Sequence, residues 1–534
     1  MCGIIAIVRR RAQRPVPDPE RVRGLIDSIA ESIPKNLEEV SELIDSLSAL
    51  ERETCGVPGT ITFLENPELT TLLTSKCQSI EAVLENFEII LNDAHFALED
   101  IEAMNSVVVK IKDLIWSLQN DRVRLVNSVR ELCQGEINEG LVEAFTSIHE
   151  SLSALDRLEV RGRDSAGLHL MIRDHALDFD DPITATEIQN RSLDNDFKSG
   201  SIRVVGDQIS FVYKTASEIG QLGDNTLVLR EAIKSDELLR QALAGGMASA
   251  IVVGHTRWAS IGIISEPNAH PLNSEQEGLK ELPYVVAAIN GDVDNFADLK
   301  DLENLVIAPA VTSDSKVMPT LMAQHLIKTD NDDQFVNQAF RKTVDSLEGS
   351  VAVVANAASD PDNLYLSLRG SGQGLYIGLA EDSYIVASEP YGLVECTQKY
   401  LRINGESMPT RSEIVSRPGE IISLSREHAG SIEGISRSSY DGVPLPVSDE
   451  EVDFAGITSR DIDRRGYPHF LLKEITEAPE SFLKTLRGKI VEIDGNLDVR
   501  LEEGSFPLEL QNKFREGGFK EIYVIGQGTA AVAG

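Results

Sequence analysis

The spacing of apolar residues changes several times along the chain, and these changes divide it into regions of different structure. The run "CGIIAIV" at residues 2–8 is continuously apolar, which is typical of a buried strand. From about residue 20 to 150 the spacing becomes three to four residues, which places apolar side chains on one face of a helix. Two such series are Leu25, Ile29, Ile33, Leu37, Val40, Ile44, Leu47 and Ile80, Leu84, Phe87, Leu91, Leu98, Ile101. Pro58, Gly59 and Pro67 mark a loop between them, so we predict a helical hairpin or small bundle, with a coiled-coil pairing segment as the alternative.

Residues 160–425 carry short β-rich runs with few long helices between them. Examples are "GLHLMI", "ASAIVVGHTRW", "YVVAAI", "SVAVVANA", "LYLSL", "LYIGLA", "SYIVAS" and "EIISLS". Such spacing predicts packed antiparallel sheets and, with the preceding helical region, an α+β fold. A polar and helical stretch from about 175 to 245 interrupts the strands.

The last hundred residues change character again. Residues 440–465 are acidic and rich in turn residues, as expected of an exposed linker. The segment "YPHFLLKEITEAPESFLKTLRGKI" predicts a helix interrupted near Pro479. The sequence "KEIYVIGQGTAAVAG" predicts a strand and a glycine-rich turn, the beginning of a parallel α/β domain that these 534 residues do not complete.

Charge and cysteine content exclude several classes of protein. Lys plus Arg number 50 against 86 Asp plus Glu, a formal net charge of −36, so a nucleic-acid partner is not expected. The only dense basic cluster, residues 9–11, is too short to change this. Five widely spaced cysteines without a C-x-x-C pair fit a reduced cytoplasm, and no run suits a signal peptide or a membrane span. We therefore expect a soluble cytoplasmic protein without a metal or cofactor.

Cys2 raises the question of chemistry. It is either a small apolar residue of a buried strand or, after removal of Met1, an N-terminal residue that carries both a thiol and a free α-amine. An α-amine has an ordinary pKa of about 7.7 to 8.0, so part of it is unprotonated near neutral pH and can accept the proton of the thiol.

Four further fragments bear on this question: "LEVRGRDSAG" (158–167), "GHTRWAS" (254–260), "INGD" (289–292) and "TSDSKV" (312–317). Each has a structural explanation when taken alone. Asn290 and Gly291 are typical of a hairpin turn, Arg257 of a surface residue, and His255 of a hydrogen-bonded core histidine.

Taken together and in this order behind "MCGI", the fragments resemble the class II glutamine amidotransferases, whose N-terminal-nucleophile fold has four αββα layers. With "NAHPL" and "INGDVDN", they are most similar to the branch that aminates and isomerises fructose 6-phosphate. "RRGYPHFLLKEITEAPESFLKTLRGKI" resembles the linker of that branch and the entry to its sugar isomerase (SIS) domain. The resemblance implies a glutamine amidotransferase domain at 2–440 with insertions at about 20–150 and 175–245, a linker at 441–480, and an incomplete SIS domain at 481–534.

The resemblance also implies catalytic roles. Cys2 would attack the side-chain amide of glutamine and form a thioester, with its own α-amine as base. Asn290 and Gly291 would form the oxyanion hole, where one fixed donor lowers the barrier by about 3 kcal/mol.

Binding roles follow in the same way. Arg257 would hold the α-carboxylate of glutamine and Asp314 its α-ammonium. Trp258 and Ser260 would belong to a loop that closes over glutamine and helps to gate the passage of ammonia. Thr529 would contact the phosphate of the sugar. The implied substrates are glutamine and fructose 6-phosphate, and the complete protein would form a homodimer or higher homo-oligomer.

Several positions depart from the family pattern. Ile261 and Ile289 stand where the family has histidine, Arg163 where it has tyrosine, Lys316 where it usually has glutamate, and Ala530 where it has the phosphate-binding serine. Two alternatives remain open: an amidotransferase of the amidophosphoribosyltransferase type, and a catalytically idle domain that acts as a binding or regulatory module.

Overall fold

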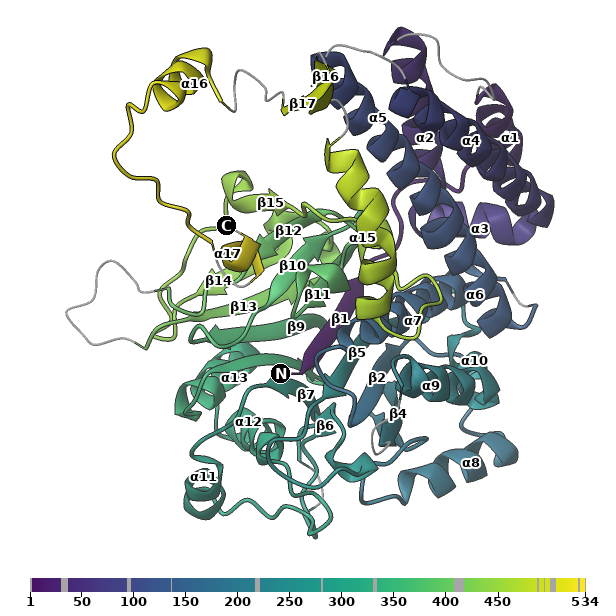
Figure 1. Cartoon of the computed structure of the whole chain (residues 1–534). Coiled ribbons are helices and arrows are strands. Elements are labelled where there is room, and N and C mark those ends of the chain that lie inside the picture. Colours follow the sequence, from purple (N-terminus) through teal and green to yellow (C-terminus); the bar gives the residue numbers. More distant parts are fainter. Residues whose placement is uncertain are drawn as a thin grey trace. The chain divides into compact units, whose positions relative to one another are not determined.

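The computed structural model describes residues 2–29, 37–93, 98–135, 137–216, 221–279, 282–329, 334–407, 417–486, 489–493, 495–499, 506–526 and 529–533. The chain forms two compact units (Figure 1). The first contains Met1–Ile29, Asp45–Cys77 and Asp113–His469, and the second contains Ala30–Ile44, Gln78–Lys112 and Phe470–Gly534. The predicted site residues other than Thr529 all belong to the first unit.

A nine-stranded sheet forms the centre of the first unit. Its order is β15-β12-β10-β11-β1-β5-β2-β4-β3, and neighbouring strands pair antiparallel. The strands are β1 (Gly3–Arg9), β2 (Ser165–Arg173), β3 (Ile202–Val205), β4 (Gln208–Ala216), β5 (Ser249–Arg257), β10 (Tyr376–Leu379), β11 (Ser383–Ala387), β12 (Lys399–Arg402) and β15 (Val452–Phe454). The continuous apolar run behind Cys2 becomes the central strand because both of its faces are buried.

A second, six-stranded sheet has the order β14-β13-β9-β8-β7-β6, again with antiparallel neighbours. The strands are β6 (Leu272–Asn273), β7 (Val285–Asn290), β8 (Val351–Ala357), β9 (Asp360–Arg369), β13 (Glu420–Ser425) and β14 (Ile435–Ser438). One buried cluster joins the two sheets, since it includes Ile4 and Val253 of the first and Val354 and Leu366 of the second. The predicted antiparallel sheets and the α+β class are confirmed.

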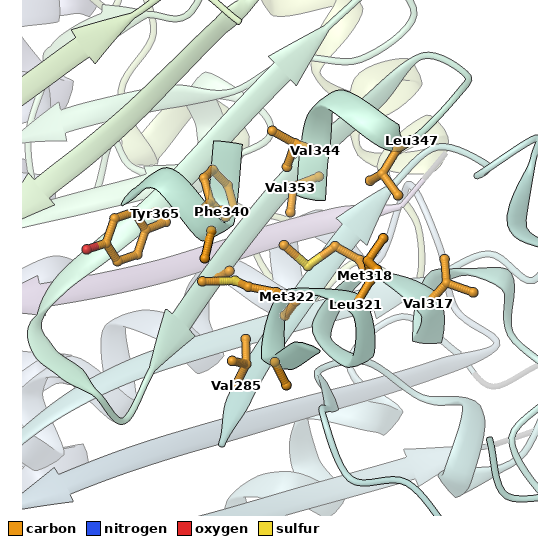
Figure 2. Packing of buried hydrophobic residues seen from close by; sticks show 14 of the residues in the cluster. Val285, Val317, Met318, Leu321, Met322, Phe340, Val344, Leu347, Val353 and Tyr365 are labelled. Atoms are coloured by element: carbon orange, nitrogen blue, oxygen red, sulfur yellow. The ribbon is translucent and has the colours of Figure 1, made fainter. Parts of the chain in front are cut away.

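Helices cover the outer face of each sheet. α12 (Val317–Lys328) and α13 (Phe335–Ser346) pack on the six-stranded sheet, where Figure 2 shows Met318, Met322 and Phe340 directed toward Val353 of β8. α7 (Glu139–Leu158) contacts β1 and β5 of the nine-stranded sheet on the face opposite to that buried cluster. The first unit therefore has the layer order helix, sheet, sheet, helix.

The helical region after β1 is confirmed, with different boundaries. Its helices are α1 (Pro19–Ser28), α2 (Leu37–Thr54), α3 (Gly56–Glu65), α4 (Pro67–Asp93), α5 (Leu98–Trp116) and α6 (Arg124–Cys133). The first apolar series is divided between α1 and α2, and Ile33 lies outside the described residues. The predicted loop at Pro58 and Gly59 is wrong, because both residues lie in the first turn of α3, where proline loses no helical hydrogen bond.

The stretch at 175–245 contains more than polar and helical sequence. The prediction of helices is confirmed by α8 (Pro182–Ser192), α9 (Asp224–Ser235) and α10 (Glu237–Leu243), whereas the strands β3 and β4 were not predicted. β4 pairs with β2 from Ser165 opposite Ala216 to Ile172 opposite Ile209. Ser210 and Lys214 are buried within β4, and such inward polar residues conceal a strand from a search for apolar runs.

The C-terminal part differs from two predictions. α15 (Phe470–Leu486) continues through Pro479, so the helix is not interrupted there, although a proline inside a helix costs about 3 kcal/mol. Residues 521–525 are not a strand, since no strand in the described part of the chain supplies the hydrogen bonds that a strand requires. The described remainder consists of an antiparallel hairpin, β16 (Ile490–Ile493) with β17 (Asn496–Val499), and of α16 (Leu508–Arg515) and α17 (Thr529–Ala533).

The segment that we assigned to a linker, 441–480, contributes to both units. β15 lies within it and pairs with β12, and the boundary between the units falls between His469 and Phe470.

The three arginines at residues 9–11 form ion pairs within the first unit. Arg9 pairs with Glu150 at 2.5 Å, Arg10 with Asp382 at 3.2 Å. Arg11 pairs in the same way with Glu143 at 2.8 Å. Among the described residues, no helix is long and apolar enough to cross a membrane.

Candidate active site

Cys2 lies at the head of the central strand of the nine-stranded sheet. β1 begins one residue later and is hydrogen-bonded to β5 on one side and β11 on the other. Gly3 is closely surrounded, because a Cβ atom there would lie 2.6 Å from both Leu158 Cβ and Thr256 Oγ1. Ile4 N donates to Ser388 Oγ at 3.0 Å. The backbone on which the thiol stands is therefore held from several directions.

The thiol of Cys2 contacts the backbone of the residue that follows β5. Trp258 N donates to Cys2 Sγ at 3.3 Å. Burial raises the pKa of the Cys2 thiol, while the Trp258 N–H and the charge of Arg257 partly oppose this rise. A thiol with a raised pKa is protonated at neutral pH, so it needs a base before it can act as a nucleophile. The predicted removal of Met1 concerns a residue outside the described part of the chain.

The side chain of Asn290, at the end of β7, reaches the same residue. Asn290 Nδ2 donates to the carbonyl oxygen of Cys2 at 2.8 Å, and the asparagine is buried. His255 Nε2 lies 3.0 Å from Asn290 Oδ1 and 3.1 Å from the carbonyl oxygen of Ile289. Both atoms are acceptors, so Nε2 carries the proton. Burial lowers the pKa of His255 to about 3, and the neutral ring thus fixes which end of the Asn290 amide faces Cys2.

Gly291 forms a tight turn that only glycine fits. Its φ is +98°, in the left-handed region, and a Cβ atom would lie 2.1 Å from the carbonyl oxygen of Ser350. Two residues further on, Val293 N donates to Asp314 Oδ2 at 2.7 Å. Burial raises the pKa of Asp314, while the N–H of Val293 and the charge of Arg257 act in the opposite direction. Asp314 therefore holds the turn that contains Gly291.

Arg257, the last residue of β5, directs its guanidinium group toward the loop that follows. It donates to the carbonyl oxygens of Ile261 and, at 3.2 Å, Ile263. Burial lowers the pKa of Arg257, while the charges of Cys2 and Asp314 act in the opposite direction. A guanidinium has five N–H donors, so these two bonds leave donors for a further acceptor.

The loop after Arg257 is attached at two more points. Ala259 N donates to Asp164 Oδ2 at 2.8 Å, and Ser260 Oγ donates to Asp292 Oδ1 at 2.5 Å. Asp292 directly follows Gly291, so the loop is joined to that turn. The Trp258 side chain is 58% exposed, and its contact with Cys2 is made by the backbone.

The structure thus brings Cys2, Arg257, Trp258, Ser260, Asn290, Gly291 and Asp314 together. Thr529 begins α17 in the second unit, and its side chain lies outside the described part. Asp164 and Asp292 stand in the motifs around the site, but the motifs predicted no role for them. The structural role predicted for His255 is confirmed, since the histidine is buried and hydrogen-bonded, with Asn290 as one partner.

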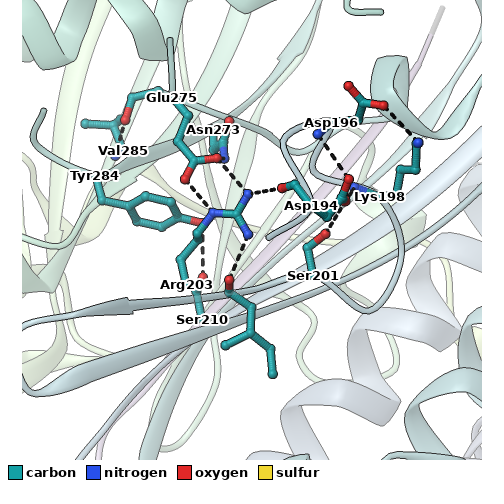
Figure 3. A network of polar contacts seen from close by, with 12 residues as sticks. Asp194, Asp196, Lys198, Ser201, Arg203, Ser210, Asn273, Glu275, Tyr284 and Val285 are labelled. Carbon is teal, nitrogen blue, oxygen red and sulfur yellow. Dashed lines mark hydrogen bonds and ion pairs between the residues drawn. The ribbon is translucent and has the colours of Figure 1, made fainter. Parts of the chain in front are cut away.

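The departure at Lys316 has a structural explanation. Lys316 is buried and donates to Asn273 O at 2.6 Å and to Asn273 Oδ1 at 3.0 Å, and burial lowers its pKa to about 8. Asn273 in turn donates to Glu275 at 2.7 Å, and Glu275 accepts from Arg203 (Figure 3). Lys316 therefore anchors the start of α12 to β6, and Glu275 joins the segment after β6 to β3. The ammonium group of Lys316 bonds to Asn273, not to Asp314.

The parts assembled here are a partly buried thiol at the start of a strand, an amide donor, a glycine turn and an arginine near a buried carboxylate. They are the parts that thiol-dependent cleavage of an amide requires. Among the described residues, no group of three His, Cys, Asp or Glu side chains could hold a metal ion.

Comparison with known proteins agrees with the motifs. The chain is 28% identical over 296 residues to a glutamine–fructose-6-phosphate aminotransferase (isomerizing) of Halalkalibacterium halodurans, covering 55% of this chain and 42% of that enzyme. It is 26% identical over 311 residues to the enzyme of the same name from Staphylococcus aureus, covering 58% and 44%. The resemblance to these aminotransferases is therefore confirmed, and the chain spans less than half the length of these curated relatives.

The other comparisons add little. No protein-family model matches the chain. Two solved structures are similar over 55% of this chain. One is the allosteric regulatory enzyme of purine biosynthesis, of which 46% is covered, and the other is glutamine phosphoribosylpyrophosphate amidotransferase from B. subtilis, of which 47% is covered. Their identities are 19% and 18% and their TM-scores 0.34 and 0.33, values too low to support an argument.

Proposed function

We propose that this chain is a glutamine amidotransferase with Cys2, freed of Met1, as its nucleophile. The sulfur attacks the side-chain carbonyl carbon of glutamine, and its proton passes to the α-amine of Cys2. The carbonyl oxygen becomes an oxyanion that accepts hydrogen bonds from the Asn290 amide and the Gly291 N–H. The C–N bond then breaks, and ammonia leaves with the proton from the α-amine. Water hydrolyses the resulting thioester to glutamate and frees the thiol.

The contacts of Cys2 with Trp258 and Asn290 carry this proposal, since they place two donors beside Cys2. Trp258 follows β5 of the same sheet, and Asn290 ends β7 of the other sheet. The raised pKa of the thiol also favours a mechanism with a base next to it. In the proposal, the unused donors of Arg257 bind the α-carboxylate of glutamine, and Asp314 binds the α-ammonium. The loop with Trp258 and Ser260 closes over them.

The fold in this proposal is the four-layer αββα fold of the N-terminal nucleophile class, supported by the observed layer order. The amidotransferase domain is 2–440, with insertions at about 20–150 and 175–245 and a linker at 441–480. The start of a SIS domain is 481–534. Since a thiol nucleophile must stay reduced, a cytoplasmic setting suits the mechanism.

The acceptor that we propose is fructose 6-phosphate, aminated and isomerised to glucosamine 6-phosphate by the complete protein. The names of the curated relatives support this choice. Thr529 is the proposed contact of the sugar phosphate, and the complete protein is proposed to be a homodimer or higher homo-oligomer.

Glutamine hydrolysis by the purified 534-residue chain tests the first part of the proposal. We expect release of glutamate and ammonia, with mass spectrometry showing Cys2 as the first residue. Cys2→Ala should abolish the activity and keep the fold. Cys55→Ala is the matched control, because Cys55 has similar partial exposure and lies outside the site. Normal hydrolysis by Cys2→Ala, or by a form that retains Met1, would show that the mechanism is wrong.

A further inference from the structure

We propose that a second site, separate from Cys2, binds a small phosphate ester. The site is a cavity of about 300 Å³ in the first unit, between α6, α7, the start of α9 and the segment that follows β15. Its polar lining comprises Arg124, His149, Ser153, Asp156, Thr226, Arg230 and Arg464. None of these residues belongs to a motif that carries the proposed amidotransferase chemistry.

The lining is cationic, whereas the chain as a whole carries a formal charge of −36. Three guanidinium groups and one carboxylate, that of Asp156, line the cavity. Arg124 is paired outside the lining with Asp463 at 3.3 Å, which leaves Arg230 and Arg464 against Asp156. Burial lowers the pKa of His149, so its ring is neutral. The lining therefore has a net positive charge, and a basic cavity in an acidic protein concentrates anions.

Two of the arginines lack a carboxylate partner. Arg230 donates to Ser128 Oγ at 2.5 Å and to His149 Nδ1 at 3.3 Å, and Arg464 donates to the carbonyl oxygen of Leu222 at 3.1 Å. Within the described part of the chain, neither forms an ion pair. Guanidinium groups match phosphate oxygens in geometry and charge, so both are suited to an anion that enters the cavity.

His149 holds one of these two arginines at the wall of the cavity. Only 3% of its surface is exposed. Its Nδ1 accepts from Arg230, so the neutral ring carries its proton on Nε2. This Nε2–H is buried and faces Glu395 Oε1 at 3.7 Å, outside the lining of the cavity. The ring therefore positions the guanidinium group of Arg230.

The carboxylates around the cavity neutralise Arg124 but not Arg230 or Arg464. Glu395 already accepts from Arg157 NH1 and Ser153 Oγ, each at 2.5 Å. Asp156 lines the cavity and is exposed, so its oxygens can accept hydrogen bonds from hydroxyl groups of a ligand. Two unpaired guanidinium groups and one acceptor fit a phosphate joined to a small hydroxylated molecule better than a bare anion.

Isothermal titration of the full chain with glycerol 3-phosphate and with inorganic phosphate, at constant ionic strength, tests the proposal. We expect saturable binding of glycerol 3-phosphate and weaker binding of inorganic phosphate. Arg464→Gln should raise the Kd for glycerol 3-phosphate about 10- to 100-fold, because the variant loses one hydrogen bond between charged groups. Arg21→Gln is the control, since it removes the same charge from an exposed position on α1.

No saturable binding by the wild type would overturn the proposal, and so would equal weakening by Arg464→Gln and Arg21→Gln. His149→Phe, which keeps a buried ring and removes the acceptor that positions Arg230, should weaken binding as well. If His149→Phe does not fold, Arg464→Gln alone decides, because its side chain is partly exposed and makes one backbone contact. Glutamine takes no part in the measurement, so its outcome does not depend on the amidotransferase proposal.

Discussion

Replacing Asn290 by alanine tests the geometry around Cys2 most directly. The amide of Asn290 donates to Cys2 O at 2.8 Å, and His255 holds it from the other side at 3.0 Å. The alanine variant loses one of the two proposed oxyanion donors. Loss of such a donor lowers kcat by about 100- to 1,000-fold, or about 3–4 kcal/mol, and leaves KM nearly unchanged.

The same change affects stability much less. Cys2 O loses its donor, at a cost of about 1–2 kcal/mol, whereas His255 keeps the carbonyl oxygen of Ile289. The variant should therefore remain folded. Asn290→Asp keeps the shape but places a carboxylate oxygen near the developing negative charge, so its kcat should fall at least as far as that of the alanine variant.

Steady-state glutamine hydrolysis and urea unfolding are the two measurements. Asn356→Ala is the matched control, because Asn356 is buried in β8 of the same sheet and donates to Asn363 O at 3.2 Å, away from Cys2. It should lose stability and keep kcat. A kcat of Asn290→Ala within tenfold of the wild-type value would refute the assignment of Asn290 as an oxyanion donor.

Three further changes give expected outcomes. Arg257→Lys should raise the KM for glutamine about tenfold or more, since an ammonium group cannot form two parallel hydrogen bonds with a carboxylate, and an unchanged KM would remove Arg257 from the pocket. Gly291→Ala should lower the free energy of unfolding by at least about 2 kcal/mol, measured in urea, because the new Cβ strains the turn and meets Ser350 O. Burial lowers the pKa of His169 from 6.5 to about 3, so the stability it contributes is present above pH 6.5 and is lost as the pH falls toward 3. Between pH 7 and about pH 5, the free energy of unfolding of His169→Gln should therefore fall by about 2 kcal/mol less than that of the wild type. An equal fall in both proteins would contradict this.

The sequence predicted the strands well where apolar residues run together. "CGIIAIV", "YVVAAI" and "SVAVVANA" each became a central strand, since a buried strand needs apolar side chains on both faces. β4 was missed because Ser210 and Lys214 interrupt its apolar run, although both are buried. Pro58 and Pro479 show the opposite error, since each predicted a break where the helix continues. Proline breaks a helix only when it lies beyond the first turn and packing does not hold the helix together.

The family resemblance of the motifs, and not their residue types alone, singled out Cys2, Arg257 and Asn290. The structure brings these residues together, but their contacts could not be predicted. The pairing of His255 with Asn290, and of Ser388 with the backbone of Ile4, joins residues that are distant in sequence. Such pairs depend on how the sheets stack, which local spacing does not encode.

The position of β1 at the centre of its sheet has a consequence for synthesis of the chain. Its partners begin only at Ser249 in β5 and Ser383 in β11. At about 5–20 residues per second, a ribosome that has completed Arg9 needs about 12–50 s to reach the first partner and about 20–75 s to reach the second. During this interval the uncharged segment at residues 3–8, which favours β structure, has no strand to pair with, and such segments aggregate readily. The yield of folded chain should therefore rise when translation takes place with chaperones that bind exposed apolar segments.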